Sequence, residues 1–215
     1  RDWETFSSAQ GVEIGEYVQF FGAGSIQELD PPRHDVLRKV LAPRFQSRRI
    51  KEYGPLIRET AERLIDGFDG RSRIDLGQEF TQRLPILTIL QLLGIPQDDH
   101  DWAASAGLEM LRRPAGEAGP SAAAAAIREE LVDYFIDQVR RRRVDGMTDD
   151  VFSDMAMGIE AGDMLESEIQ GLTLLLIAAG METTSSLMGN IAHAVATDAV
   201  EVSALLDDAG QFRAP

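Results

Sequence analysis

The chain has 215 residues, of which 44% are hydrophobic and 27% are charged, and its formal net charge at pH 7 is −15. This balance is ordinary for a globular protein, and the negative charge argues against a general nucleic-acid binder. No apolar run reaches the length of about 18 residues that a membrane span needs, and no signal peptide is recognisable. We therefore expect one mainly α-helical, cytoplasmic body that binds no nucleic acid and does not span a membrane.

The first strong helix signal lies near residues 31–45. Asp30 is a favourable N-cap, and the Pro31-Pro32 pair suits the first turn of a helix. His34 and Arg38 follow at a spacing of i and i+4, so they share one helix face. The planar guanidinium of an arginine suits a carboxylate, which makes this face a candidate binding surface for an anionic group.

The segment from Arg33 to Lys51 is basic in an otherwise acidic chain. Its cations are Arg33, Arg38, Lys39, Arg44, Arg48, Arg49 and Lys51, opposed only by Asp35. Two interpretations remain open, a solvated basic face and a surface that binds an anionic group or partner. Phe45 and Ile50, in the same segment, are assigned to packing.

Between residues 53 and 143 the apolar residues recur at helical spacing. The expected helices are 53–68, 79–93, 98–111 and 121–143, with Gly94 ending the second of them. The last helix carries an apolar stripe that predicts core packing, made of Ile127, Leu131, Tyr134, Phe135 and Val139. Residues 114–120 predict a flexible connection. Arg140 to Arg143 are expected at the solvated C-terminal end of a helix, where cations suit the helix dipole.

The most informative run is LLLIAAGMETT, residues 174–184, inside a helix predicted from 167 to 197. Gly180 costs about 1 kcal/mol relative to alanine inside a helix. The two threonines that follow can hydrogen-bond to carbonyl groups one turn earlier. We therefore predict irregular backbone bonding between Ala179 and Thr183.

That irregularity has two interpretations. The first is a groove in a buried helix, where Glu182 and Thr183 serve a small ligand and a proton route. The second is a kinked helix of the core that has no ligand.

Two motifs occur in order along the chain. They are Asp30-Pro31-Pro32 followed by His34 and Arg38, and the run Ala179-Gly180-Met181-Glu182-Thr183-Thr184. They resemble the C-helix entrance and the central I-helix motif of the cytochrome P-450 superfamily, the haem-thiolate monooxygenases, and residues 5–9 resemble the bacterial members. The resemblance implies an incomplete P-450-like helical bundle, from the C to the I helix, in one partial domain over residues 1–215. In it the C helix lies near 31–45, the F/G region near 98–143 and the I helix near 167–197.

The resemblance implies haem b as the cofactor, with a cysteine thiolate as its axial ligand. The chain contains no cysteine. We therefore expect an internal portion of a longer enzyme that lacks the haem-ligand half and cannot be active alone. The alternative is a haem-free P-450-like helper protein that stabilises a partner enzyme.

The resemblance also implies a reaction, the activation of O2 and the hydroxylation of a small hydrophobic organic substrate. The expected site residues are Glu182 and Thr183 for catalysis, His34, Arg38, Ala179 and Gly180 for haem binding, and Leu175 and Ala178 for the substrate pocket. Thr183 is expected to hydrogen-bond the bound dioxygen, and Glu182 to relay protons to it. Electrons are expected from an acidic ferredoxin-type donor that docks at the Arg33 to Lys51 face.

Overall fold

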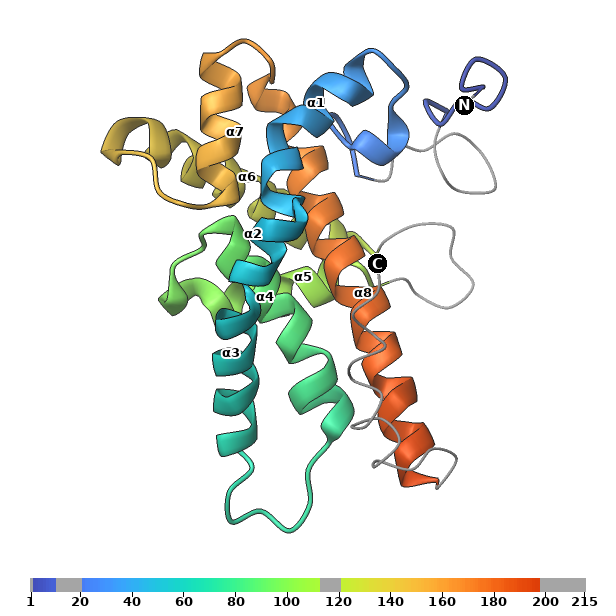
Figure 1. Cartoon of the computed structure of the whole chain (residues 1–215), viewed down its shortest axis with the longest axis vertical. Coiled ribbons are helices and arrows are strands. Elements are labelled where there is room, and N and C mark those ends of the chain that lie inside the picture. Colours follow the sequence, from blue (N-terminus) through green and yellow to red (C-terminus); the bar gives the residue numbers. More distant parts are fainter. Residues whose placement is uncertain (1, 11–20, 113–120, 198–215) are drawn as a thin grey trace.

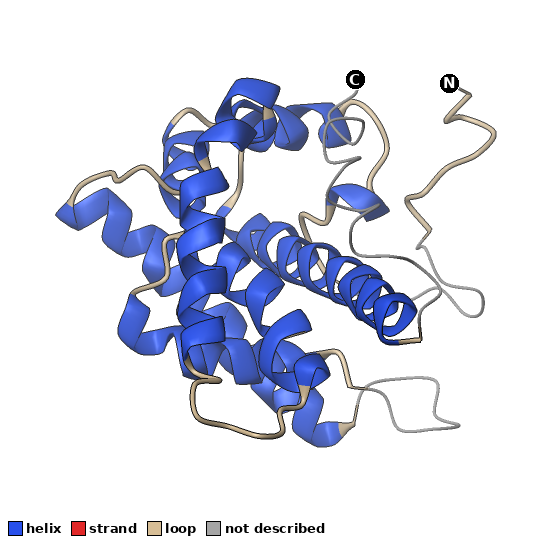
Figure 2. Cartoon of the chain, turned by 60° about the horizontal axis from the view of Figure 1, so that its bottom comes forward, coloured by secondary structure: helices blue, strands red, loops and turns tan. Residues whose placement is uncertain are grey.

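The computed structural model describes residues 2–10, 21–112 and 121–197, and within them every regular element is a helix (Figure 2). The α-helices are α1 (Arg33–Leu41), α2 (Ser47–Glu52), α3 (Gly54–Asp66), α4 (Arg83–Leu93), α5 (His100–Met110), α6 (Ala122–Asp145), α7 (Val151–Glu160) and α8 (Ile169–Ala196). Short 3-10 turns join them at η1 (Ile26–Glu28), η2 (Ala42–Phe45), η4 (Gln97–Asp99) and η5 (Glu166–Glu168). The prediction of a mainly α fold is confirmed. The predicted connection at 114–120 lies outside the described residues.

Helix α8 runs along the long axis of the molecule, and the other helices are arranged around its first half (Figure 1). Helices α4 and α6 pack against α8, while α5 and α7 pack against α6. Helix α1 packs against α7 and lies beside the upper part of α8 in Figure 1. This arrangement brings the two predicted motifs, on α1 and α8, to the same side of the molecule.

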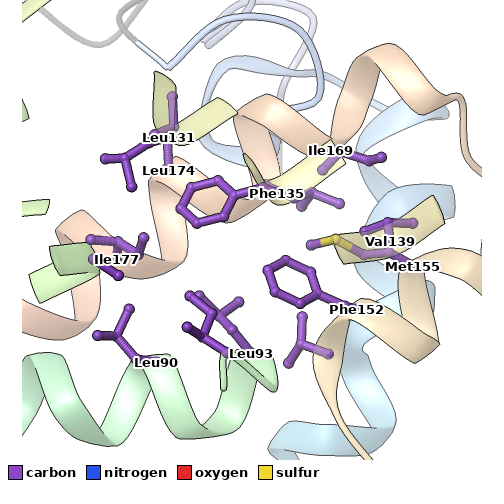
Figure 3. Packing of buried hydrophobic residues seen from close by; sticks show 14 of the residues in the cluster. Leu90, Leu93, Leu131, Phe135, Val139, Phe152, Met155, Ile169, Leu174 and Ile177 are labelled. Atoms are coloured by element: carbon purple, nitrogen blue, oxygen red, sulfur yellow. The ribbon is translucent and has the colours of Figure 1, made fainter. Parts of the chain in front are cut away.

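The core lies where α4, α6, α7 and α8 meet (Figure 3). Phe135 of α6 and Phe152 of α7 are fully buried, with their ring centroids 5.9 Å apart. Of the apolar stripe predicted on α6, Leu131, Phe135 and Val139 are buried, and the other two members pack partly buried against the core. The periodicity of α6 therefore gives its core face correctly.

The predicted helix 79–93 is two elements, which corrects the expectation of a single helix. A π-helical turn, η3 (Gly77–Thr81), precedes α4. Pro85 then falls in the first turn of α4, where its missing N–H group has no intrahelical partner to lose. Gly94 ends α4 with a φ of 90°, as the sequence predicts.

Asp30 does not cap α1, so this prediction is wrong. The helix begins after Pro32 without a side-chain cap. The Asp30 carboxylate instead accepts a hydrogen bond from the Ser7 hydroxyl and, at 3.0 Å, one from the backbone N–H of Ser8. These bonds hold the pKa of Asp30 below its ordinary value, and the bond from Ser7 has the largest effect. Asp30 therefore ties the N-terminal segment to the start of α1.

The predicted irregularity between Ala179 and Thr183 is also wrong, because α8 is one unbroken α-helix from Ile169 to Ala196. Thr183 does bond back as expected, with its hydroxyl donating to the Ala179 carbonyl oxygen at 2.8 Å. The helix nevertheless keeps its regular hydrogen bonds. Gly180 is thus accommodated without a bend, and the space left by its missing side chain has a different use, described below.

Arg142 departs from the expected solvated helix end. Its side chain is only 16% exposed and lies 2.8 Å from the Asp150 carboxylate. It also donates to the Gly94 carbonyl oxygen at 2.6 Å. This arginine therefore joins the end of α6 to the end of α4 and the start of α7. Its three arginine neighbours lie on the surface in ion pairs, as a solvated helix end predicts.

One stretch of the described residues, Glu166–Ala196, is long and apolar enough to cross a membrane by length and composition, with a mean hydropathy of 1.3. A central core helix has the same features. The first half of α8 is buried in the core, whereas Leu187 and Ile191 in its second half are 60% and 45% exposed. Burial among the other helices therefore accounts for the apolar character of the first half.

Gly171 offers a direct test of how closely α8 approaches the chain before η1. Its N–H donates to the Ala23 carbonyl oxygen at 2.9 Å, and a Cβ there would lie 2.2 Å from the Ser25 nitrogen. Because the clash is with backbone, Gly171→Ala should lower the free energy of unfolding by about 1–3 kcal/mol. Urea denaturation measures this. Gly54→Ala, where a Cβ meets nothing within 4 Å, is the control, and equal midpoints for the two variants would contradict the close approach.

Candidate functional site

A groove of about 480 Å³ separates α1 from the middle of α8. Its lining comes from five elements and consists of Ile26, Gln27, His34, Arg38, Phe45, Ile89, Leu175, Leu176, Ala179 and Gly180. Half of these residues have aliphatic side chains, and Phe45 adds an aromatic one. Four of the residues predicted for haem binding and one predicted for the substrate pocket therefore meet in a single groove, although the chain separates them widely.

Helix periodicity explains which residues of α8 face the groove. Leu175 and Ala179 are four residues apart, as are Leu176 and Gly180, so the four form one stripe along the helix. Ala178 points elsewhere and is buried in the core at 8% exposure. The structure therefore places Leu175 in the groove and does not bring Ala178 to it.

The wall opposite α8 is formed by α1. His34 and Arg38 both line the groove, as their i, i+4 spacing predicts. His34 Nδ1 lies 2.8 Å from the Asp35 carboxylate. Arg38 is exposed and, within the part of the chain that the structure describes, has no ion-pair partner. A guanidinium in this state is available to an anionic group that enters the groove.

The cations of the predicted basic face divide into two sets, which corrects the expectation of one continuous surface. Arg33 forms a bidentate pair with Glu168 and donates to the Asp163 carbonyl oxygen at 3.1 Å. Arg44 is buried at 7% exposure among acidic residues of the α7 region. Arg49 pairs with residues Glu52 and Asp149.

The other four cations of the segment are turned outward. Arg38 faces the groove, while Lys39, Arg48 and Lys51 are exposed on α1 and α2. Arg48, at 94% side-chain exposure, lies 3.7 Å from Glu52 in an i, i+4 pair, a contact that is weak at such exposure. The positive surface left to a partner is therefore smaller than the sequence suggests.

Glu182 and Thr183 do not line the groove, but they lie next to it on α8. Thr183 follows Ala179 by four residues and Gly180 by three, so it continues the groove-facing stripe by one turn. Its hydroxyl is anchored on the carbonyl of Ala179, a groove residue. Glu182 is exposed to solvent beside it. The two predicted catalytic residues thus stand at the edge of the groove rather than inside it.

Sequence reasoning missed several lining residues. Leu176 could have been found, because it precedes Gly180 by one helical turn. Phe45 was assigned to packing, yet it is 46% exposed and borders the groove. Ile26, Gln27 and Ile89 carry no local signal, since their position depends on how η1 and α4 pack against α8.

The groove has the chemistry of a site for a largely apolar molecule that carries an anionic group. Aliphatic side chains and the small Ala179 and Gly180 offer a low apolar surface on the α8 side. Arg38 and His34 offer hydrogen-bond donors on the α1 side. An amphipathic ligand could therefore lie along α8 with its anionic edge toward α1.

No model of a known protein family matches the sequence. The chain is 32% identical over 180 residues to Cytochrome P450 107B1 of Saccharopolyspora erythraea. This match covers 83% of this chain and 43% of the relative. The chain is also 32% identical over 182 residues to the Vitamin D(3) 25-hydroxylase of Pseudonocardia autotrophica, over 84% of this chain and 44% of the relative. A solved mutant of P450 EryK in complex with erythromycin B matches with a TM-score of 0.72 and 25% identity, over 94% of this chain and 51% of the other. The chain spans about half the length of the relatives that it matches.

Proposed function

The chain belongs to the cytochrome P-450 superfamily, and on that premise we propose that it forms the α1 and α8 side of a haem site in a monooxygenase that hydroxylates a small hydrophobic molecule. The observation that carries the proposal is the shared groove. His34 and Arg38 face Ala179 and Gly180 across it, and this is the arrangement that haem binding between the two motifs requires.

The residues present fit a haem. The aliphatic lining with Ala179 and Gly180 suits the face of a macrocycle, and Arg38 with His34 suits its propionates, because charge-assisted bonds to a carboxylate are strong. Bound haem would supply the iron on which dioxygen is reduced by two electrons and two protons. The 215 residues contain no cysteine, so a thiolate ligand would have to come from other residues. We do not expect this chain to be active by itself.

Thr183 and Glu182 are proposed to handle protons at the edge of the groove. The Thr183 hydroxyl rests on the Ala179 carbonyl oxygen at 2.8 Å. Threonine in a helix populates two χ1 rotamers, so rotation can release this carbonyl and turn the hydroxyl hydrogen toward the groove. Glu182, which is open to solvent, would accept protons from water and pass them to the Thr183 oxygen.

The substrate is proposed to lie against the apolar part of the groove wall near Leu175. Leu175 lines the groove, whereas the burial of Ala178 in the core gives no support to its role in the substrate pocket. An acidic, ferredoxin-type electron donor is proposed to dock on the outward cations Lys39, Arg48 and Lys51, where unlike charges would guide the encounter. This pairing suits a cytoplasmic enzyme, which is the location we propose.

Arg38→Ala tests the proposed function in the haem-loaded protein. Loss of a charge-assisted partner of the propionates should weaken haem retention by about 1.5–3 kcal/mol, or roughly 10- to 150-fold. Transfer of haem to an excess of apomyoglobin, followed through the Soret band, measures retention. Lys39→Ala removes the same charge from the same helix outside the groove and is the control.

Two results would oppose the proposal in different ways. Equal haem loss from the Arg38 and Lys39 variants would remove Arg38 from the haem site. A protein isolated under haem-replete conditions with no Soret absorption would favour the alternative, a haem-free helper protein.

A further inference from the structure

Two residues of the groove lining, Gly180 of α8 and Ile89 of α4, lie very close together. Neither sequence motif explains this contact. A Cβ built on Gly180 would lie 2.6 Å from Ile89 Cδ1 and 2.7 Å from its Cγ1. Both distances are far inside ordinary van der Waals contact between carbon atoms. While Ile89 keeps its place, only glycine fits at position 180.

Another glycine of α8 shows that this crowding is specific. Gly189 also lies in the interior of α8, and a Cβ there would meet nothing within 4 Å. Glycine in an exposed helix interior costs stability relative to alanine. Gly180 therefore has a packing reason to be glycine that Gly189 lacks.

Ile89 and Gly180 also belong to the lining of the same groove. The side chain that fills the space beside the α8 backbone is thus supplied by α4. An isoleucine in a helix has one strongly preferred χ1 rotamer, so the position of Cγ1, 2.7 Å from the built Cβ, is restricted, whereas Cδ1 can still turn about χ2. The volume of the Ile89 side chain decides how deeply a ligand can approach Gly180.

We propose that Ile89 and Gly180 form a size-matched pair that sets the depth of the groove, with Ile89 determining which flat ligands fit. The claim that Ile89 determines ligand fit, the ligand part, rests on the proposed haem function. The claim that the two residues are matched in size, the packing part, does not, since it depends only on the distance between Ile89 and the α8 backbone.

The packing part is tested by urea unfolding of the 215-residue chain with Gly180→Ala in two backgrounds. With Ile89 present, the added methyl should raise the unfolding equilibrium constant by about 5- to 100-fold, as overpacking does. With Ile89→Ala, the same methyl has room and should lower the constant by about 2- to 5-fold through helix propensity. Gly189→Ala, the control, should lower it by the same factor in both backgrounds. If Gly180→Ala has the same effect with and without Ile89, the pair is not size-matched and the proposal fails.

The ligand part is tested with protoporphyrin IX, which has the shape and propionates of haem but needs no iron ligand. Its fluorescence on titration gives the dissociation constant. Ile89→Ala removes apolar contact worth about two methylene groups and should weaken binding about tenfold. Adding Gly180→Ala should recover part of the loss. Ile65→Ala, at an exposed position outside the groove, should change nothing.

The possible failures can be told apart. An unchanged dissociation constant in Ile89→Ala overturns the role of Ile89 in ligand fit. If the unsubstituted chain binds no porphyrin, the proposed haem function fails. The unfolding measurement still tests the size match, because Gly180→Ala should raise the unfolding equilibrium constant when Ile89 is present and lower it in the Ile89→Ala background.

Discussion

Arg44→Met is expected to lower the free energy of unfolding by about 3–5 kcal/mol, because it leaves the largely buried carboxylate of Asp154 without its cation. Arg44 lies in η2 at 7% exposure. Its guanidinium pairs with both oxygens of Asp154, contacts Asp149 Oδ1 at 2.9 Å and donates to the Asp150 carbonyl oxygen at 2.7 Å. The Asp154 side chain is only 15% exposed, so water cannot replace the lost partner.

Urea denaturation of the Arg44→Met chain measures the loss, and Arg48→Met is the matched control. Arg48→Met removes the same charge from the neighbouring helix, but the Arg48 side chain is 94% exposed. An ion pair at such an exposed position contributes about 0–1 kcal/mol. The double variant Arg44→Met, Asp154→Leu should recover much of the stability, since replacing both members of a buried pair by apolar groups is far less costly than removing one. An Arg44→Met chain as stable as the Arg48→Met chain would show that the network contributes nothing.

Thr183→Ala, made in the longer haem-loaded enzyme of which we propose this chain is a part, is expected to divert reducing equivalents from hydroxylated product to hydrogen peroxide. The substitution removes the hydroxyl that we propose to direct a proton from the Thr183 oxygen into the groove, while the groove lining stays intact. Consumption of dioxygen should therefore continue. Glu182→Gln should instead slow turnover by about 100-fold, because a carboxylate that relays protons contributes about that much or more.

Peroxide and product, both measured against the reductant consumed, separate this role from a structural one. Thr184→Ala removes a neighbouring hydroxyl from the same helix and is the control. If the Thr183 hydroxyl only satisfies the Ala179 carbonyl, its loss would reduce stability without changing the ratio of peroxide to product. A fully coupled Thr183→Ala protein would rule out the proton role.

Local patterns predicted the parts of the fold that depend on neighbouring residues. The apolar stripe of α6 gave its buried face, and the i, i+4 spacing gave the shared face of His34 and Arg38. The meeting of that face with Ala179 and Gly180 followed only from the family resemblance. Two helices far apart in sequence carry no mutual signal of their own.

The failed predictions concern residues whose partners lie elsewhere in the chain. Propensity made Gly180 a source of bending, but its neighbour Ile89 on α4 gives it a packing role in a regular helix. Capping rules assigned Asp30 to α1, but Ser7 and Ser8 offered it other donors. Charge pattern placed Arg44 on the surface, but the acidic residues around α7 bury it. In each case a tertiary contact overrides a weak local preference.

Of the three arginines that pair with acidic residues rather than joining the basic face, two also determine how the groove meets a ligand. Arg33 fastens the start of α1 to Glu168 just before α8, and Arg44 fastens η2, directly after α1, to Asp154 of α7. With both of its ends held, α1 keeps His34 and Arg38 in position before any ligand arrives. Association then loses little backbone conformational entropy on this wall, although the Arg38 side chain must still be ordered, and more of the interaction energy is expressed as affinity. A preorganised wall of this kind also favours ligands whose charges match its fixed spacing over those that would need it to adjust.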